Sequence, residues 1–310
     1  MDVLTLINDG AGSVAKTGDV KELVREGLRQ RGLEADVRMV PGREIGKIAK
    51  SFVSDFPPRS ALLVGVGDGT ISAAASALAG TEKVLGVLPL GTLNHFAKDL
   101  GLPMELGAAM DVIAAGNATM IDVAEVNGRV FLNNSSIGVY SFFVAERTTE
   151  QRRSGASKLA AIGPALARTL KAASWQSVQI AAEGTREELR TPCVFVGNNF
   201  YDAADFGRRK SLSSGDLCVY LVRRQSWLGL MVLPLKIALG LIDTARDVEL
   251  IQAKTLEIAS RHRDVIVSLD GEAVEMKMPL RFRIRPAALR VLSPAKQDAH
   301  EIGHRAKASK

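Results

Sequence analysis

The segment Ala61–Thr70 reads Ala-Leu-Leu-Val-Gly-Val-Gly-Asp-Gly-Thr and joins an apolar run to a glycine-rich turn. The run Ala61–Val66 predicts a buried strand, and Ile71–Leu78 continues with the period of a helix. Glycines between them let backbone N–H groups approach phosphate oxygens, because no Cβ stands in the way. The N-terminus of the following helix adds a partial positive charge. The segment therefore predicts a strand, a turn and a helix that cradle a phosphate group.

Two common phosphate-binding motifs fit this turn less well. A dinucleotide-binding GxGxxG loop needs a third glycine where Thr70 stands, and Asp68 places an acidic residue inside the loop. A Walker A loop needs Gly-Lys followed by Ser or Thr, which is absent here. A glycine turn that binds no ligand stays open as an alternative.

A second loop follows the next predicted strand, Val84–Leu88, and reads Pro-Leu-Gly-Thr-Leu-Asn-His over residues 89–95. Gly91 permits close approach of the backbone, and Thr92 and Asn94 offer neutral donors at the start of a helix. Ligands of open parallel sheets bind beyond the carboxyl ends of the strands. We therefore expect the two loops to face one crevice.

The pattern around these loops predicts an α/β domain over residues 1–125. Apolar runs that predict strands are Val3–Ile7, Ala35–Val40, Ala61–Val66, Val84–Leu88 and Met120–Val126. Segments with helical period are Lys21–Arg31, Glu44–Ser54, Ile71–Leu78, Asn94–Leu100 and Leu106–Ala115. This alternation implies βαβ units and a doubly wound, mostly parallel sheet.

After about residue 127 the pattern changes to short alternating segments with turn signals. The segments that predict strands are Arg129–Asn133, Ser177–Ala182, Cys193–Val196, Leu217–Val222, Thr255–Ala259, Val265–Leu269 and Leu280–Ile284. They predict an antiparallel β-sandwich over residues 126–294, with helical insertions near Ser157–Ala172 and Ser226–Ala245. We expect residues 295–310 to be a disordered tail, because they are polar and rich in Lys and His.

The cysteine content and the N-terminal residues indicate the cellular compartment. The two cysteines, Cys193 and Cys218, are too few for a disulfide framework and have no metal-binding spacing, which indicates a reducing compartment. No basic region precedes the apolar N-terminal run, so we expect a cytoplasmic protein. The longest apolar stretch, Trp227–Ile242, is shorter than the roughly 20 residues that span a bilayer.

The net charge of +6 and the pI near 9.4 suit anionic partners such as phosphates, lipid headgroups or nucleic acid. Basic residues cluster at residues 208–210, 223–224 and 281–290 and in the tail. A solvated basic surface without a specific partner accounts for the charge equally well. No nucleic-acid-binding motif accompanies it, so we expect no nucleic acid partner.

At the glycine motifs the sequence resembles a known family. Gly67–Thr70 resembles the Gly-Gly-Asp-Gly-Thr motif of diacylglycerol, sphingosine, ceramide and NAD kinases, with Val66 where the first glycine usually stands. Pro89–Asn94 is similar to the Pro-x-Gly-Thr-x-Asn-Asp loop of the lipid-kinase branch. Further matches follow in the family's order, at Ile121-Asp122, Phe131–Asn133, Gly138, Gly215–Leu217 and Leu269–Glu272. Together the matches cover about residues 60–290.

The resemblance implies an ATP-dependent lipid kinase that uses Mg²⁺ and works in a cleft between its two domains. It implies that Asp270 is the general base and Glu272 its neighbour, although either could take that role. By the same resemblance, Asp68 and Asp122 arrange Mg²⁺ around the phosphates, and Asp216 holds a structural Mg²⁺. Taken alone, the Asp-Gly at residue 270 also suits a simple hairpin, and the Gly-Asp at residue 216 needs no metal.

Two positions depart from the family pattern. His95 stands where the second Asp of the Asn-Asp pair is usual, which replaces a fixed negative charge. The N-terminal loop keeps Asn8 but loses the proline of the family's Asn-Pro-x-Ser-Gly loop. The residues expected to contact the nucleotide are Asn8, Gly10, Gly12, Gly67, Asp68, Gly69, Thr70, Gly91, Thr92 and Asn94.

Three functions are compatible with the sequence. The first is a kinase for the hydroxyl of a diacylglycerol, ceramide or long-chain base. The second is an NAD kinase, which the Gly91–Asn94 loop and the lack of an adenine or nicotinamide signature argue against. The third is a lipid-binding regulator without catalysis, motivated by His95 and the altered Asn8 loop and opposed by the retention of Asp270 and Glu272.

The expected partner is a membrane lipid. The apolar segment Ser226–Ile242, flanked by Arg223-Arg224 and Arg246, suits peripheral contact with the inner face of a membrane. A helix buried on the sandwich is the alternative. The sequence does not name the lipid, and it leaves the oligomeric state, including a homodimer, open.

Overall fold

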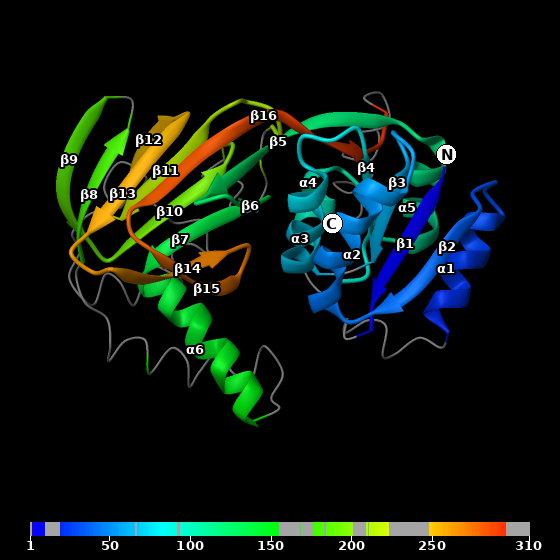
Figure 1. The fold of residues 1–310 in the computed structure, drawn as a ribbon, viewed down its shortest axis with the longest axis horizontal. Coiled ribbons are helices and arrows are strands. Elements are labelled where there is room, and N and C mark those ends of the chain that lie inside the picture. Colours follow the sequence, from blue (N-terminus) through cyan, green and yellow to red (C-terminus); the bar gives the residue numbers. More distant parts are fainter. Residues whose placement is uncertain are drawn as a thin grey trace, which may run out of the picture. The chain divides into compact units, whose positions relative to one another are not determined.

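The structure is a computed structural model that describes residues 2–9, 19–65, 67–91, 94–154, 168, 176–182, 184–200, 209, 211–222 and 248–295. The chain divides into two compact units, whose elements are labelled in Figure 1. The first unit contains Met1–Val123 and Pro286–Lys310, and the second contains Ala124–Arg285. The helical insertions and the tail expected from the sequence lie outside the described residues, apart from residues 168 and 295.

The first unit is built on a parallel sheet (Figure 1). Its strands run in the order β2-β1-β3-β4 and are β1 (Val3–Asn8), β2 (Ala35–Val40), β3 (Ala61–Gly65) and β4 (Val84–Leu88). Its helices are α1 (Val20–Arg29), α2 (Gly42–Asp55), α3 (Asp68–Leu78), α4 (His95–Asp99) and α5 (Leu106–Ala115). All residues of β3 and β4 are buried, as expected for strands covered on both faces. The predicted α/β domain is confirmed.

Helices α1 and α5 share one hydrophobic core with this sheet. Val24 and Leu28 of α1 are buried together with Met110 and Ile113 of α5. Gly27 permits the close approach of the two helices, because a Cβ at this position would lie only 2.4 Å from Cε of Met110. A larger residue at position 27 would therefore require the Met110 side chain to move.

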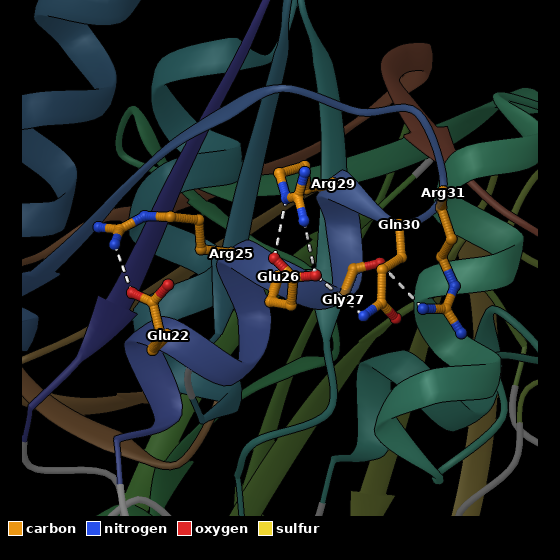
Figure 2. Close-up of polar contacts among 7 residues, drawn as sticks. All are labelled: Glu22, Arg25, Glu26, Gly27, Arg29, Gln30 and Arg31. Carbon is orange, nitrogen blue, oxygen red and sulfur yellow. Dashed lines mark hydrogen bonds and ion pairs between the residues drawn. The ribbon is translucent and has the colours of Figure 1, made fainter.

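The other face of α1 is charged and exposed. Figure 2 shows Glu26 accepting hydrogen bonds from Arg29 at 2.8 Å and from Gln30 at 3.0 Å. The Nε of Arg31 donates to Asp111 of α5 at 2.6 Å. Exposed pairs within one helix contribute roughly 0.2–0.5 kcal/mol each. The position of α1 therefore depends mainly on its buried face.

The second unit consists of antiparallel β-structure. One sheet has the order β12-β11-β10-β7-β14-β15, with strands β7 (Asn134–Gly138), β10 (Cys193–Asn198), β11 (Leu217–Val222), β12 (Val248–Ala253), β14 (Asp264–Leu269) and β15 (Glu272–Lys277). The other strands of the unit are β5 (Ala118–Val126), β6 (Arg129–Phe131), β8 (Gln176–Ala182), β9 (Thr185–Thr191), β13 (Thr255–Ser260) and β16 (Leu280–Leu292). Side chains of both sets form one core, in which Phe131 and Phe282 meet edge to face. The predicted β-sandwich is confirmed.

Four strands were not predicted from the sequence: β7, which is central in its sheet, and three strands at sheet edges. β9 ends one strand path, and β12 and β15 end the six-stranded sheet. Their sequences, TREELRT, VELIQA and EAVEMK, carry charged side chains. Charges at an edge discourage pairing with other chains, and they also weaken the alternation that marks a strand.

Helix α6 (Val139–Ser154) was also not expected. Its first turns, Val139–Val144, are rich in β-branched and aromatic residues, which favour a strand. Contacts with β7, β14 and β15 override this preference. In the part of the chain that the structure describes, neither α6 nor any other helix combines the length and apolar content needed to cross a membrane.

The chain passes between the two units twice, once within β5 and once within β16. After Pro286, the end of β16 joins the sheet of the first unit, where Arg290 and Val291 pair in parallel with β4. Ala287 has a positive φ of 47°, and its N–H donates to the carboxylate of Asp122 at 2.8 Å. Residues 286–294 were expected in the second domain, but they belong to the first unit.

The two cysteines give a test of the second core. Cys193 and Cys218 are free and buried, and burial raises the pKa of the Cys193 thiol to about 12 and that of Cys218 to about 11. The thiolate is the reactive form. We expect neither cysteine to react with an aromatic disulfide reagent at about pH 8 in the folded protein, and both to react after denaturation. Rapid labelling of the native protein would contradict this arrangement.

Candidate functional site

Three strand ends lie at one edge of the sheet in the first unit. β1 ends at Asn8, β3 at Gly65 and β4 at Leu88, and these parallel strands are neighbours. The expected nucleotide contacts follow these ends. Gly10, Gly12 and Thr92 lie outside the described residues.

Asp68 joins the loop after β3 to the loop after β4. It is the first residue of α3, with Gly67 as the N-cap. Its Oδ2 accepts a hydrogen bond from the backbone N–H of His95 at 3.2 Å, and its Oδ1 accepts from that of Phe96 at 3.0 Å. The carboxylate thereby caps the N-terminus of α4. The structure thus brings the two loops together through one side chain.

The same contact explains how the loop accommodates His95. Only the backbone N–H of His95 binds Asp68, and its side chain is exposed. The bond to Asp68 is therefore compatible with different side chains at position 95. The neighbouring Asn94 has a left-handed backbone, is buried, and donates from Nδ2 to the carbonyl of Pro89 at 3.2 Å. Asn94 thus shapes its own loop.

The glycines near β3 have different roles. A Cβ at Gly65 would lie 2.7 Å from Cδ1 of Leu90, so packing against the second loop requires glycine there. Among the residues that the structure describes, which exclude residues 66, 92 and 93, no atom lies within 4 Å of a Cβ at Gly67, so their packing does not require glycine at that position. The open space at Gly67, at the N-terminus of α3, suits a ligand that approaches the backbone.

Two of the predicted metal-binding carboxylates accept backbone hydrogen bonds within the first unit. Asp68 binds α4, and Asp122 is 2% exposed and binds the N–H of Ala287. Asp216 lies in the second unit, where its carbonyl accepts from Asn199 N–H at 3.1 Å. Among the described residues, no three His, Cys, Asp or Glu side chains come together in a way that could hold a metal ion.

The turn between β14 and β15 fixes Asp270 firmly. Asp270 and Gly271 both have positive φ, 46° and 82°, as in a two-residue hairpin turn. The carboxylate of Asp270 accepts three backbone hydrogen bonds, from Leu132 at 2.8 Å, Asn133 at 2.8 Å and Asn134 at 3.1 Å. These bonds hold both oxygens in one orientation. Asp270 is therefore suited to positioning the turn.

Glu272 follows this turn as the first residue of β15, opposite Leu269. Its side chain is exposed. The turn is also approached from α6, where Nη2 of Arg147 lies 3.4 Å from the carbonyl of Gly271. Glu272 thus lies at an exposed position directly after the turn that Asp270 fixes.

A buried polar cluster, not predicted from the sequence, holds the segment that binds Asp270. Arg209 is 8% exposed and donates to the carbonyls of Leu132 and Asn198 and to Oδ1 of Asn133. Nδ2 of Asn198 also donates to the Leu132 carbonyl, at 2.9 Å. The basic cluster at residues 208–210 was interpreted as surface charge, but Arg209 is an internal residue. Asn198 and Asn199 at the end of an apolar strand were the available signal.

Comparison with known proteins supports the architecture described above. A family model described as diacylglycerol kinase catalytic domain matches residues 2–126. A second model, described as YegS C-terminal NAD kinase beta sandwich-like domain, matches residues 138–293. An α/β unit with joined strand-end loops, followed by a β-sandwich, thus defines the class of diacylglycerol kinase-like proteins. The second model alone matches half of the chain, so the chain belongs to the YegS-type family of this class.

Curated relatives match the chain in part. A protein of Escherichia fergusonii named "Probable lipid kinase YegS" is 36% identical over 130 residues, which are 40% of this chain and 42% of the relative. A "Probable lipid kinase YegS-like" protein of Yersinia enterocolitica is 33% identical over 146 residues, 45% of this chain and 48% of the relative. The matches span less than half the length of these relatives.

Solved structures show the same fold along nearly the whole chain. A proposed diacylglycerol kinase of Bacillus anthracis has a TM-score of 0.71 and 22% identity, and the match covers 94% of this chain and 95% of that one. A diacylglycerol kinase of the same organism has a TM-score of 0.65 and 18% identity, with coverage of 94% and 96%.

Replacing Asp270 and Glu272 separately tests their different settings. We expect Asp270→Ala to lower the free energy of unfolding by about 1–3 kcal/mol, because three backbone N–H groups lose their acceptor. Glu272→Ala, at an exposed position, is expected to change it by less than about 0.5 kcal/mol. Urea unfolding followed by circular dichroism measures both. Equal effects would show that the Asp270 bonds do not hold the turn.

Proposed function

We propose that the protein is an ATP-dependent lipid kinase, which transfers the terminal phosphate of ATP to the hydroxyl group of a lipid. The observation that carries the proposal is the bridge from Asp68 to His95 and Phe96, which joins two glycine-containing loops at neighbouring strand ends. Family membership and the names of the lipid kinase relatives support it. Diacylglycerol, ceramide and long-chain bases are the acceptors we consider.

The nucleotide phosphates are proposed to bind at Gly67 and at the start of α3. The open space at Gly67 and the partial positive charge of the helix N-terminus favour phosphate oxygens there. Mg²⁺ is usually held by one or two carboxylates together with substrate phosphates, and it would neutralise their charge. Asp68 fits this role, since each of its oxygens keeps a further lone pair. Asp122 fits less well, because it is buried and bonded to Ala287.

We propose Glu272 as the general base. As the lipid oxygen bonds to the phosphorus, the hydroxyl proton passes to the Glu272 carboxylate and ADP leaves with the electrons of the broken P–O bond. The Glu272 carboxylate is exposed, whereas the Asp270 carboxylate already accepts three N–H groups. In this proposal, Asp270 holds the turn in place and Glu272 carries the proton.

An acceptor survey tests the activity. The protein is incubated with labelled ATP, Mg²⁺ and mixed micelles that contain diacylglycerol, ceramide or sphingosine, with NAD as a parallel acceptor. A labelled lipid supports the proposal. Label in NADP alone would instead identify an NAD kinase, and lipid binding without any product would identify a regulator.

Replacing Glu272 tests the assignment of the base. We expect Glu272→Gln to lower kcat by roughly 10² or more, with the KM for ATP unchanged, because general base catalysis contributes about this factor. Glu275→Gln is the matched control, since Glu275 is exposed on the same strand. Wild-type turnover in Glu272→Gln would remove Glu272 from the mechanism and return the role to Asp270.

Replacing Gly67 tests the phosphate cradle. Its φ of −83° suits alanine, and no described residue lies within 4 Å of the added methyl group, so we expect Gly67→Ala to fold normally. The methyl group would occupy the path of the phosphates and raise the KM for ATP roughly tenfold, about 1.4 kcal/mol of binding. Ser51→Ala is the control, because it is a small substitution at an exposed position of α2, outside these loops. An unchanged KM in Gly67→Ala would place the phosphates elsewhere.

A further inference from the structure

The segment Leu132–Asn134, between β6 and β7, is held from two sides. On one side its three consecutive N–H groups donate to the Asp270 carboxylate. On the other side the guanidinium of Arg209 donates to the Leu132 carbonyl and, at 3.2 Å, to Oδ1 of Asn133. A negative and a positive side chain thus bind opposite ends of the Leu132–Asn133 peptide group.

This arrangement is polarised. The cation withdraws electron density at the Leu132 carbonyl, which strengthens the Asn133 N–H of the same peptide group as a donor to Asp270. Buried arginines are rare and costly, because the charge loses its hydration. Arg209 offsets that cost with bonds to Leu132, Asn133 and Asn198, and an aliphatic side chain would fill the space without providing them.

The remaining contacts of the segment are also fixed. Nδ2 of Asn198 donates to the Leu132 carbonyl at 2.9 Å, and its backbone N–H donates to the Asn133 carbonyl at 2.9 Å. Asn198 is the last residue of β10, a central strand of its sheet. Arg209 and β10 together therefore form a rigid support against which Asp270 is held.

We propose that Arg209 is a positioning residue for phosphoryl transfer, acting through Leu132–Asn134 and Asp270 on the turn that precedes Glu272. This inference rests on the proposed function, in which Glu272 accepts the proton of the lipid hydroxyl. Asp270 and Gly271 form a two-residue turn, so a shift of Asp270 moves the first residue of β15 directly. Displacing a reacting group by about 1 Å costs up to roughly 10²-fold in rate.

Kinetics of a double-mutant cycle test the coupling. Arg209→Lys keeps the charge but loses the planar fork, so we expect kcat to fall roughly tenfold, with the KM for ATP unchanged. In the Asp270→Asn background the same change should cost far less, because the path through Asp270 is already weakened. Arg281→Lys is the matched control, since Arg281 is exposed and pairs with Glu257 at 3.0 Å. Equal losses in both backgrounds would overturn the proposal.

Hydrogen exchange provides a readout that does not depend on kinase activity. We expect Arg209→Lys to speed exchange of the Leu132, Asn133 and Asn134 amides at least about tenfold, while the amides of Val194–Val196 in β10 keep their protection. If Arg209→Lys fails to fold, Asn133→Ala removes a single acceptor of Arg209 and is measured in the same way. Unchanged exchange of the three amides overturns the inference. Failure of the wild-type protein to phosphorylate any acceptor refutes the proposed function, and hydrogen exchange still decides the role of Arg209.

Discussion

The carboxylate of Asp270 binds three consecutive backbone N–H groups, and the arrangement of the β14–β15 hairpin depends on this contact. Without it, the turn would be tied to β7 by the ladder of β14 and by the bond from the Asp270 N–H to the Asn134 carbonyl. With it, the turn is fixed on a segment that Arg209 and Asn198 hold from behind. Glu272, which is exposed, follows this fixed turn as the first residue of β15.

The same physical device occurs in the first unit. Asp68, like Asp270, is an acidic residue beside glycine, and its two oxygens also bind successive backbone N–H groups of a second loop. In both units an aspartate of a recognisable motif anchors one loop to another. Among the described residues, no atom lies within 4 Å of a Cβ built at the neighbouring Gly67, and the nearby Glu272 is exposed. In the proposed kinase reaction, the motif aspartates would serve preorganisation, which phosphoryl transfer requires more than covalent chemistry.

The sequence was sufficient for the fold class because the central strands are nearly continuous apolar runs, as in β3 and β4. It was insufficient for β9 and β15, whose edge positions call for charge instead of alternation. The motifs located Asp68 and Asp270, but their partners lie 28 and 138 residues away, which no local pattern encodes. The prediction that residues 208–210 form a charged surface was wrong for Arg209, which is buried. A run of basic residues does not indicate which of them lies in the interior.

The return of the last strand to the first unit has a consequence for how the molecule can be divided. Arg290 and Val291 cover the side of β4 that faces away from β3. A fragment that stops near residue 126, where the catalytic-domain match ends, would leave that side of β4 without its partner. An apolar strand with a bare flank invites association with other chains. Expression of residues 1–126 by themselves would therefore favour insoluble material, and a fragment to which residues 286–294 are fused by a linker is the sounder design.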